Sequence, residues 1–153
     1  RRTLERVPAD KFEWRPHEKS GTMIWLAGHL ANLPQWARLA RAADEPALAP
    51  GGEQMPPPPT PASVDELVAT FDRHAAEARA ALAAASDADF MKPWSLLSNG
   101  TVLMTLPKAA VIRSFVMNHL IHHRAQLGVY LRMNDVPVPS IYGPSADEAP
   151  PGF

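Results

Sequence analysis

Apolar residues recur at helical spacing over three long stretches of the chain. The first runs from Thr22 to about Ala43, and either Ser20 or Thr22 can cap it. On a wheel of about 100° per residue its apolar positions share one face: Trp25, Leu26, Leu33, Trp36 and Ala40. Pro34 lies inside this stretch. Because proline donates no backbone hydrogen bond and crowds the carbonyl four residues earlier, we expect a kink or a break just after Asn32.

The other two stretches carry their own start and stop signals. Ser63 and Glu66 have the spacing of a capping box, and the helix behind them is expected to end near Ser86. Its apolar stripe consists of Val64, Leu67, Val68, Phe71, Ala75, Ala78 and Leu82. Pro107 suits a first helical position, and the third pattern runs over 109–133 before an asparagine and two prolines stop it.

The remaining segments complete the predicted architecture. Residues 1–7 are typical of the end of a helix whose beginning lies upstream, and 45–61 form a proline-rich crossover. The segment 94–106 is expected to form a short hairpin around the pair Asn99-Gly100, and the proline-rich tail 136–153 to lie over the surface. The sequence therefore predicts an all-α single domain over residues 1–153, a four-helix bundle with a long crossover and a hairpin before the last helix.

Composition narrows the functional classes. Fifteen basic and sixteen acidic residues leave a net charge of −1, so the chain has no basic field to attract nucleic acid. The chain has no cysteine, which excludes disulfides, thiolate ligands and a cysteine nucleophile. No apolar run approaches the ~18 residues of a membrane span, and no secretory signal opens the sequence. We expect a soluble, cytoplasmic protein with a small-molecule substrate.

Three histidines are candidate metal ligands. His119 and His123 are four residues apart, the helical spacing at which two imidazoles can reach a single ion. On the helical wheel both share a face with Phe115 and Tyr130, and His29 shares one with the tryptophans of its own helix. We expect all three to point into the core and to hold one divalent ion. The alternative is that they are ordinary core histidines bonded to backbone carbonyls.

Other polar residues near these positions are weaker candidates for a role at the metal site. His122 lies about 60° from the centre of the stripe and is expected in a supporting position or on the surface. Gln126 shares the inward face and could orient a ligand or substrate, or be a buried amide bonded to backbone. Asn32, about one turn beyond His29, has the same two interpretations. His74 and His17 are expected to be solvated.

Three segments together resemble one known family. They are Gly28-His29-Leu30 with Asn32, the block Asn118–Leu127, and the tail Val136–Pro144. This pattern is similar to the DinB family, a superfamily of damage-inducible, YfiT-like bacterial four-helix bundles that bind metal. The resemblance implies zinc or nickel on His29, His119 and His123 with water at open positions, and a homodimer. It also implies a chemistry, which in this family is mostly the transfer of low-molecular-weight thiols such as bacillithiol or mycothiol, with some isomerases and hydrolases.

Two functions follow from this reading. Three neutral ligands leave a divalent ion with positive charge and an open position for a substrate thiolate or an activated water. Leu120, not glutamate, follows the first histidine, so no built-in general base is visible, which favours a thiol cosubstrate over peptide hydrolysis. The leading hypothesis is a metal-dependent transferase or hydrolase. The alternative is a non-catalytic, metal-stabilised binding or stress-response protein, whose structural site would be closed by a fourth protein ligand.

Overall fold

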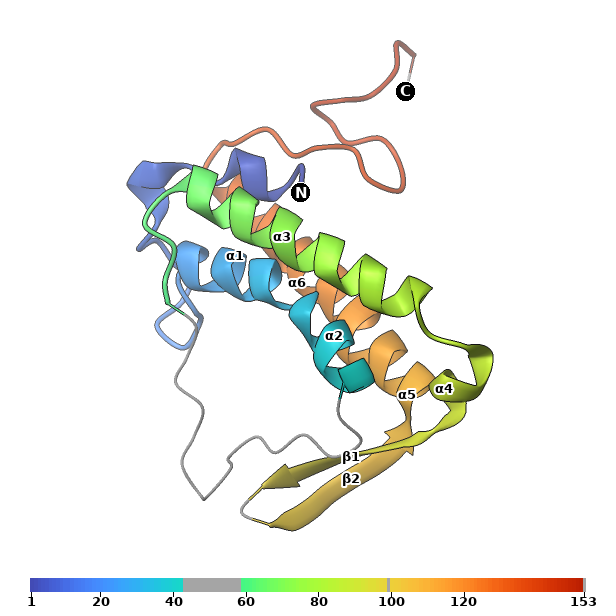
Figure 1. Cartoon of the computed structure of the whole chain (residues 1–153). Helices are drawn as coiled ribbons and strands as arrows, with labels where there is room; N and C mark the ends of the chain where they lie inside the picture. Colours follow the sequence, from blue (N-terminus) through green and yellow to red (C-terminus); the bar gives the residue numbers. More distant parts are fainter. Residues whose placement is uncertain (43–58, 99, 153) are drawn as a thin grey trace. The chain divides into compact units, whose positions relative to one another are not determined.

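The computed structural model describes residues 1–42, 59–98 and 100–152, and these residues are mostly helical with one two-stranded hairpin (Figure 1). The chain forms two compact units. The first consists of Arg1–Ala31, Thr60–Asp72 and Ile121–Phe153, and the second of Asn32–Pro59 and Arg73–Leu120. The expected helical class and the hairpin are confirmed. The expected crossover over 45–61 lies almost entirely outside the described residues.

The first unit starts with two short 3₁₀ helices, Leu4–Arg6 and Ala9–Lys11, followed by α1 over Met23–Asn32. Two hydrogen bonds hold the start of α1 in place. Met23 donates its backbone N–H to the carbonyl of Trp14 at 2.8 Å, and Thr22 Oγ1 accepts the N–H of Trp25 at 3.3 Å. Thr22 therefore caps the helix as predicted, because it satisfies a donor that the first turn leaves free.

The predicted interruption at Pro34 is present. Helix α1 ends at Asn32, and α2 begins at Gln35 and runs to Ala42. Between them Ala37 donates to the carbonyl of Pro34 at 3.1 Å, so the chain re-enters a helix directly after the proline. A proline in the first turn leaves no donor unsatisfied, which explains why the second helix starts here.

Helix α3 covers Val64–Ala83. Ser63 Oγ accepts the N–H of Glu66, while the Glu66 carboxylate accepts the N–H of Ala62 in place of the Ser63 N–H that a capping box uses. The helix ends three residues before Ser86, the predicted end. Ser86 instead forms a full capping box with Asp89 and starts a short helix, α4, over Asp87–Met91. The sequence predicts that the preceding helix ends near Ser86, and it does not predict α4.

The hairpin consists of β1, Pro93–Ser98, and β2, Thr101–Pro107, paired antiparallel with Trp94 opposite Leu106. The register shifts between Leu96 and Leu97, which marks an irregularity of the β-bulge kind. Gly100 has a φ of 75°, a conformation that a glycine adopts without steric cost in a tight turn. Pro107 ends β2 and is the N-cap residue of the next helix, which begins at Lys108, so it stands one position before the first helical residue and not at that residue as predicted.

The C-terminal helical region contains an unpredicted change of geometry. Helix α5 covers Lys108–Val111, a π-helical segment follows over Ile112–Asn118, and α6 runs over His119–Met133. The sequence predicted one uninterrupted pattern here. π-Helical turns are rare and occur often at functional sites. This one ends directly before His119, one of the three candidate metal ligands.

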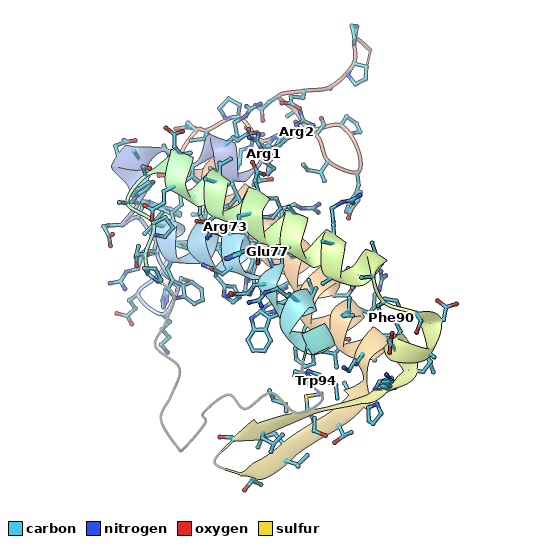
Figure 2. The ribbon with its side chains drawn as sticks, in the orientation of Figure 1. Arg1, Arg2, Arg73, Glu77, Phe90 and Trp94 are labelled. Carbon is cyan, nitrogen blue, oxygen red and sulfur yellow. The ribbon has the colours of Figure 1, made fainter. Side chains whose placement is uncertain are left out.

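The second unit has two apolar clusters. The first gathers around the buried indole of Trp94, with Ala40, Val111 and Ile112, and Phe90 packs against it. Figure 2 labels Phe90 and Trp94 in this unit. The second cluster contains Ala37, Ala78 and Val116, with Trp36, Leu82 and Leu120 at its edge. Burial of these side chains is the main favourable term for the folding of this unit.

The C-terminal tail folds back onto the N-terminal residues of the first unit. Arg2 and Arg6 both pair with Glu148, and Arg132 of α6 pairs with Asp147. Figure 1 shows the tail, in red, leaving the end of α6 beside the blue N-terminal residues. The predicted position over the surface is therefore confirmed for this unit. Within the described part of the chain, no helix has the length and apolar character needed to cross a membrane.

Candidate metal centre

Two of the candidate ligands lie on α6. His119 is its first residue and His123 follows one turn later. The histidines were expected to point into the core, but both are only half-buried. The buried positions of α6 are Leu127 and Leu131, about a quarter turn around the helix from the histidine face. The histidines therefore lie along the edge of the apolar stripe, where solvent and small molecules can reach them.

His29 lies on α1 and is also half-buried. Its ring stacks in parallel on the indole of Trp25, with centroids 5.4 Å apart and an angle of 5°. Trp25 was expected on the buried face of the helix, yet 55% of its surface is exposed. The buried positions of α1 include Leu26, Ala27 and Leu30. Leu26 and Leu33 of the predicted apolar face are buried, so the prediction of this face is wrong for Trp25 and right for these two leucines.

Helices α1 and α6 bring the three imidazoles together. The rings of His29 and His123 are nearly perpendicular, at 86°, with centroids 4.7 Å apart. Each of His29, His119 and His123 offers one ring nitrogen, and these nitrogens all lie within 4.8 Å of one another. In a tetrahedral zinc site with Zn–N bonds of about 2.0–2.1 Å, two nitrogens are about 3.4 Å apart. The three side chains therefore fit a single divalent ion after small movements, and imidazole suits zinc and nickel.

A neighbouring amide fixes one of these rings. His123 Nδ1 lies 2.6 Å from Gln126 Oε1, one turn further along α6. When the amide oxygen accepts, the proton is on Nδ1, and Nε2 is the ring nitrogen whose lone pair can bind a metal ion. Gln126 itself is exposed, so the predicted inward position is wrong, and its role in orienting a ligand stays a prediction that this contact with His123 supports. His122 is exposed, and its ring centroid is 4.8 Å from that of His123.

A profile of the DinB superfamily matches residues 1–127 of the 153. The chain belongs to the DinB superfamily. Its structure is similar to that of a DinB-like protein from Bacillus subtilis solved by crystallography, with a TM-score of 0.68 and 17% sequence identity. The match covers 93% of this chain and 88% of the other. At this identity the likeness concerns the fold alone. A comparison with curated proteins found no match.

The remaining candidate residues of this DinB-superfamily chain are not members of the three-histidine group. Asn32 is the last residue of α1 and is half-buried. His17 is exposed and accepts the N–H of Lys19 with Nδ1 at 3.1 Å, while His74 is half-buried on α3. Among the residues that the structure describes, the group with metal-ligand spacing is that of the three histidines.

Sequence reasoning missed the aromatic neighbour of the centre. Trp25 and His29 are one turn apart on α1, a spacing at which side chains touch on a helix surface. This spacing could have indicated the stack. The apolar character of tryptophan instead placed it in the core, because composition alone does not distinguish a buried indole from an exposed one.

Proposed function

We propose that this DinB-superfamily protein is a metal-dependent enzyme that holds one divalent ion, zinc or nickel, on His29, His119 and His123. The observation that carries the proposal is the convergence of one nitrogen from each of the three rings within 4.8 Å. Three half-buried imidazoles with no acidic residue among them form a neutral ligand set. Such a set leaves the full charge of the ion to act on a substrate.

Each residue has a definite task in this proposal. His119 and His123 present their nitrogens from consecutive turns of α6, and His29 approaches from α1. Gln126 holds the proton of His123 on Nδ1, as partners of ligating histidines commonly do. The position of the rings at the edge of the core, and not inside it, gives a substrate access to the centre. When bound, the ion supplies a positive charge that favours the thiolate form of a thiol or the hydroxide form of water.

The protein environment favours a low-molecular-weight thiol as cosubstrate over hydrolysis. A zinc hydrolase commonly has a carboxylate beside the metal that takes a proton from water. Leu120 occupies the position after His119 and packs at the edge of the Val116 cluster, so it offers no such group. A thiol needs less assistance because it is far more acidic than water. We therefore propose transfer of a thiol similar to bacillithiol or mycothiol, with hydrolysis as the second reaction class.

A purely structural metal is the competing interpretation. Structural zinc is usually closed by four protein ligands. Within residues 1–42, 59–98 and 100–152, the cluster offers three. This number supports an open, reactive position. X-ray absorption of the zinc-loaded protein would distinguish the two cases, since a fourth protein donor would favour the structural role.

We also propose that the helices assemble as a four-helix bundle and that the protein is a homodimer. Support for the bundle comes from the likeness to the DinB-like crystal structure. Support for the dimer comes from the family alone. Light scattering at micromolar concentration would test it, and a molecular mass of one chain would contradict it.

A direct assay tests the enzymatic proposal. The zinc- or nickel-loaded protein is mixed with bacillithiol or mycothiol and 1-chloro-2,4-dinitrobenzene. The thiolate sulfur forms a bond to the ring carbon, chloride leaves, and the thiol proton goes to the buffer. We expect a metal-dependent rate above that of the uncatalysed reaction, lost in His123→Ala. Equal rates with and without loaded protein, for both thiols and both metals, would contradict thiol transfer.

A further inference from the structure

We propose that the exposed indole of Trp25 is a binding wall beside the metal centre, and that it selects substrates carrying a flat, apolar group. The inference rests on the proposed function, because it names the substrate class of the same site. The argument starts from the unusual state of this side chain. Tryptophan buries more apolar surface than most residues, so one that is 55% exposed is an informative exception.

The exposed indole is held in a fixed place. Its ring stacks on His29, and the residue's backbone N–H is bonded to Thr22 Oγ1. On another side it lies against the backbone of Gly21, where an added Cβ would come within 2.4 Å of Trp25 Cε3. Since atoms cannot approach so closely, a side chain at position 21 would push the indole away. Gly21 thus leaves the space that the ring occupies.

Gly21 is itself anchored to α6. Its carbonyl accepts the hydroxyl of Tyr130 at 3.3 Å, and the Tyr130 ring meets Trp14 edge to face with centroids 5.4 Å apart. The N–H of Met23 is bonded to the carbonyl of Trp14. These contacts tie the start of α1 to the helix that carries His119 and His123. The indole is therefore preorganised with respect to the ligands, and a substrate would lose little free energy in ordering it.

The chemistry of the wall defines the group that it receives. An indole offers a large π surface, and offset or edge-to-face contacts with another ring add about 0.5–1.5 kcal/mol to the burial of area, which is about two- to twelvefold in affinity. The three candidate ligands beside it are imidazoles, which bind a metal ion in their neutral form. A substrate that binds the ion through one atom and carries an aromatic or other flat apolar group would satisfy both surfaces. An equally reactive substrate with a short alkyl group would gain only the bond to the ion.

The experiment uses two thiols that differ in this respect. The protein is loaded with cobalt(II), and the binding of benzyl mercaptan and of ethanethiol is followed by the sulfur-to-cobalt charge-transfer absorption. The measured quantity is the ratio of their two dissociation constants. We expect Trp25→Ala to reduce the preference for benzyl mercaptan about fivefold to tenfold, and Trp25→Phe to retain most of it. Gly21→Ala, which displaces the ring without removing it, should reduce the preference as well.

Two controls separate this inference from the proposed metal site. Tyr142 is another exposed aromatic residue, and it lies in the tail, where its ring contacts Arg124 of α6. Tyr142→Ala should therefore leave the ratio of the two dissociation constants unchanged. Cobalt content is measured for every variant, because Trp25 touches a candidate ligand. A wild-type protein that takes up no cobalt would overturn the metal site and the wall together. Full cobalt uptake with the same ratio in wild type and Trp25→Ala would overturn the wall alone.

Discussion

The distance of 2.6 Å between His123 Nδ1 and Gln126 Oε1 links a candidate metal ligand to a side chain on the exposed surface of α6. The hydrogen bond holds one tautomer and one orientation of the ring. With the proton on Nδ1, Nε2 is the ring nitrogen that can coordinate an ion. In metal centres, a residue that hydrogen-bonds to a ligating histidine commonly has a large effect on metal affinity, although it does not touch the metal.

The first prediction concerns this hydrogen bond. Gln126→Ala removes the acceptor, so the ring can rotate and change its tautomer, and the zinc dissociation constant should rise about 10–100-fold. Gln126→Glu keeps an acceptor and should retain most of the affinity. The measurement is competition with a chromophoric chelator, with His122→Ala as control. Equal affinities in wild type and Gln126→Ala would show that the contact has no role in metal binding.

A second prediction concerns which face of α6 is the core. Leu131 is fully buried, and Met133, two residues later, is 56% exposed. Leu131→Ala should lower the free energy of unfolding by about 2–5 kcal/mol, because it leaves a cavity. Met133→Ala should change it by less than about 0.5 kcal/mol. Denaturation in urea measures both. Similar losses in the two variants would contradict the observed position of the apolar stripe.

The tail gives a prediction on pH. A backbone hydrogen bond from Ser140 and the guanidinium of Arg2 hold the pKa of Glu148 below its ordinary value, against the effect of desolvation. A hydrogen bond from Arg132 likewise lowers the pKa of Asp147. A carboxyl group whose pKa is lower in the folded state contributes stability above the pKa of the unfolded state, and this contribution is lost as the pH falls through the folded value.

Glu148→Gln should therefore lower the thermal midpoint near pH 7, and this deficit should be smaller near pH 3, because the contribution of the carboxylate is lost as the pH falls through its lowered folded-state pKa. Thermal unfolding followed by circular dichroism at the two pH values measures this difference. Glu18→Gln, which changes an exposed glutamate elsewhere in the first unit, is the matched control. A deficit of the same size at both pH values would contradict the electrostatic explanation.

The helix cap at Ser86 gives a fourth prediction. Its hydroxyl accepts the N–H of Asp89, and the Asp89 carboxylate accepts the N–H of Ser86. Ser86→Ala should lower the free energy of unfolding by about 1 kcal/mol, the usual effect of losing a cap. Ser114→Ala, at an exposed position of the π-helical segment, should have a much smaller effect. Equal stability of Ser86→Ala and wild type in urea denaturation would contradict this role.

Local signals explain how much of the fold the sequence predicts. Proline chemistry at Pro34 and the Asn99-Gly100 pair act over a few residues, and the break and the hairpin were both found. Ser86 was misread because a serine after a helical pattern can end one helix or cap the next. The π-helical segment Ile112–Asn118 escaped altogether, since its sequence continues the periodicity of an α-helix.

The sequence predicted which residues are the candidate ligands, but it did not predict which residues surround them. The spacing of His119 and His123 fixes their relation on one helix, the helical wheel added His29 as a third candidate, and the family resemblance supported all three. A helical wheel locates a face only to within the width of the apolar stripe, so it placed Gln126 and Trp25 inside, whereas both are exposed. Which residues border a site depends on how helices are rotated against one another. That rotation is set by packing, and local periodicity does not encode it.

The central claim is that His29, His119 and His123 hold one divalent ion. Its most direct test is metal per chain, by atomic emission, after purification without a polyhistidine tag and dialysis against zinc or nickel. The account predicts about one ion per wild-type chain, a large loss in each of His29→Ala, His119→Ala and His123→Ala, and near-full occupancy in His122→Ala and His17→Ala. A wild type that binds neither metal, or a His119→Ala variant that keeps its full complement, would contradict it.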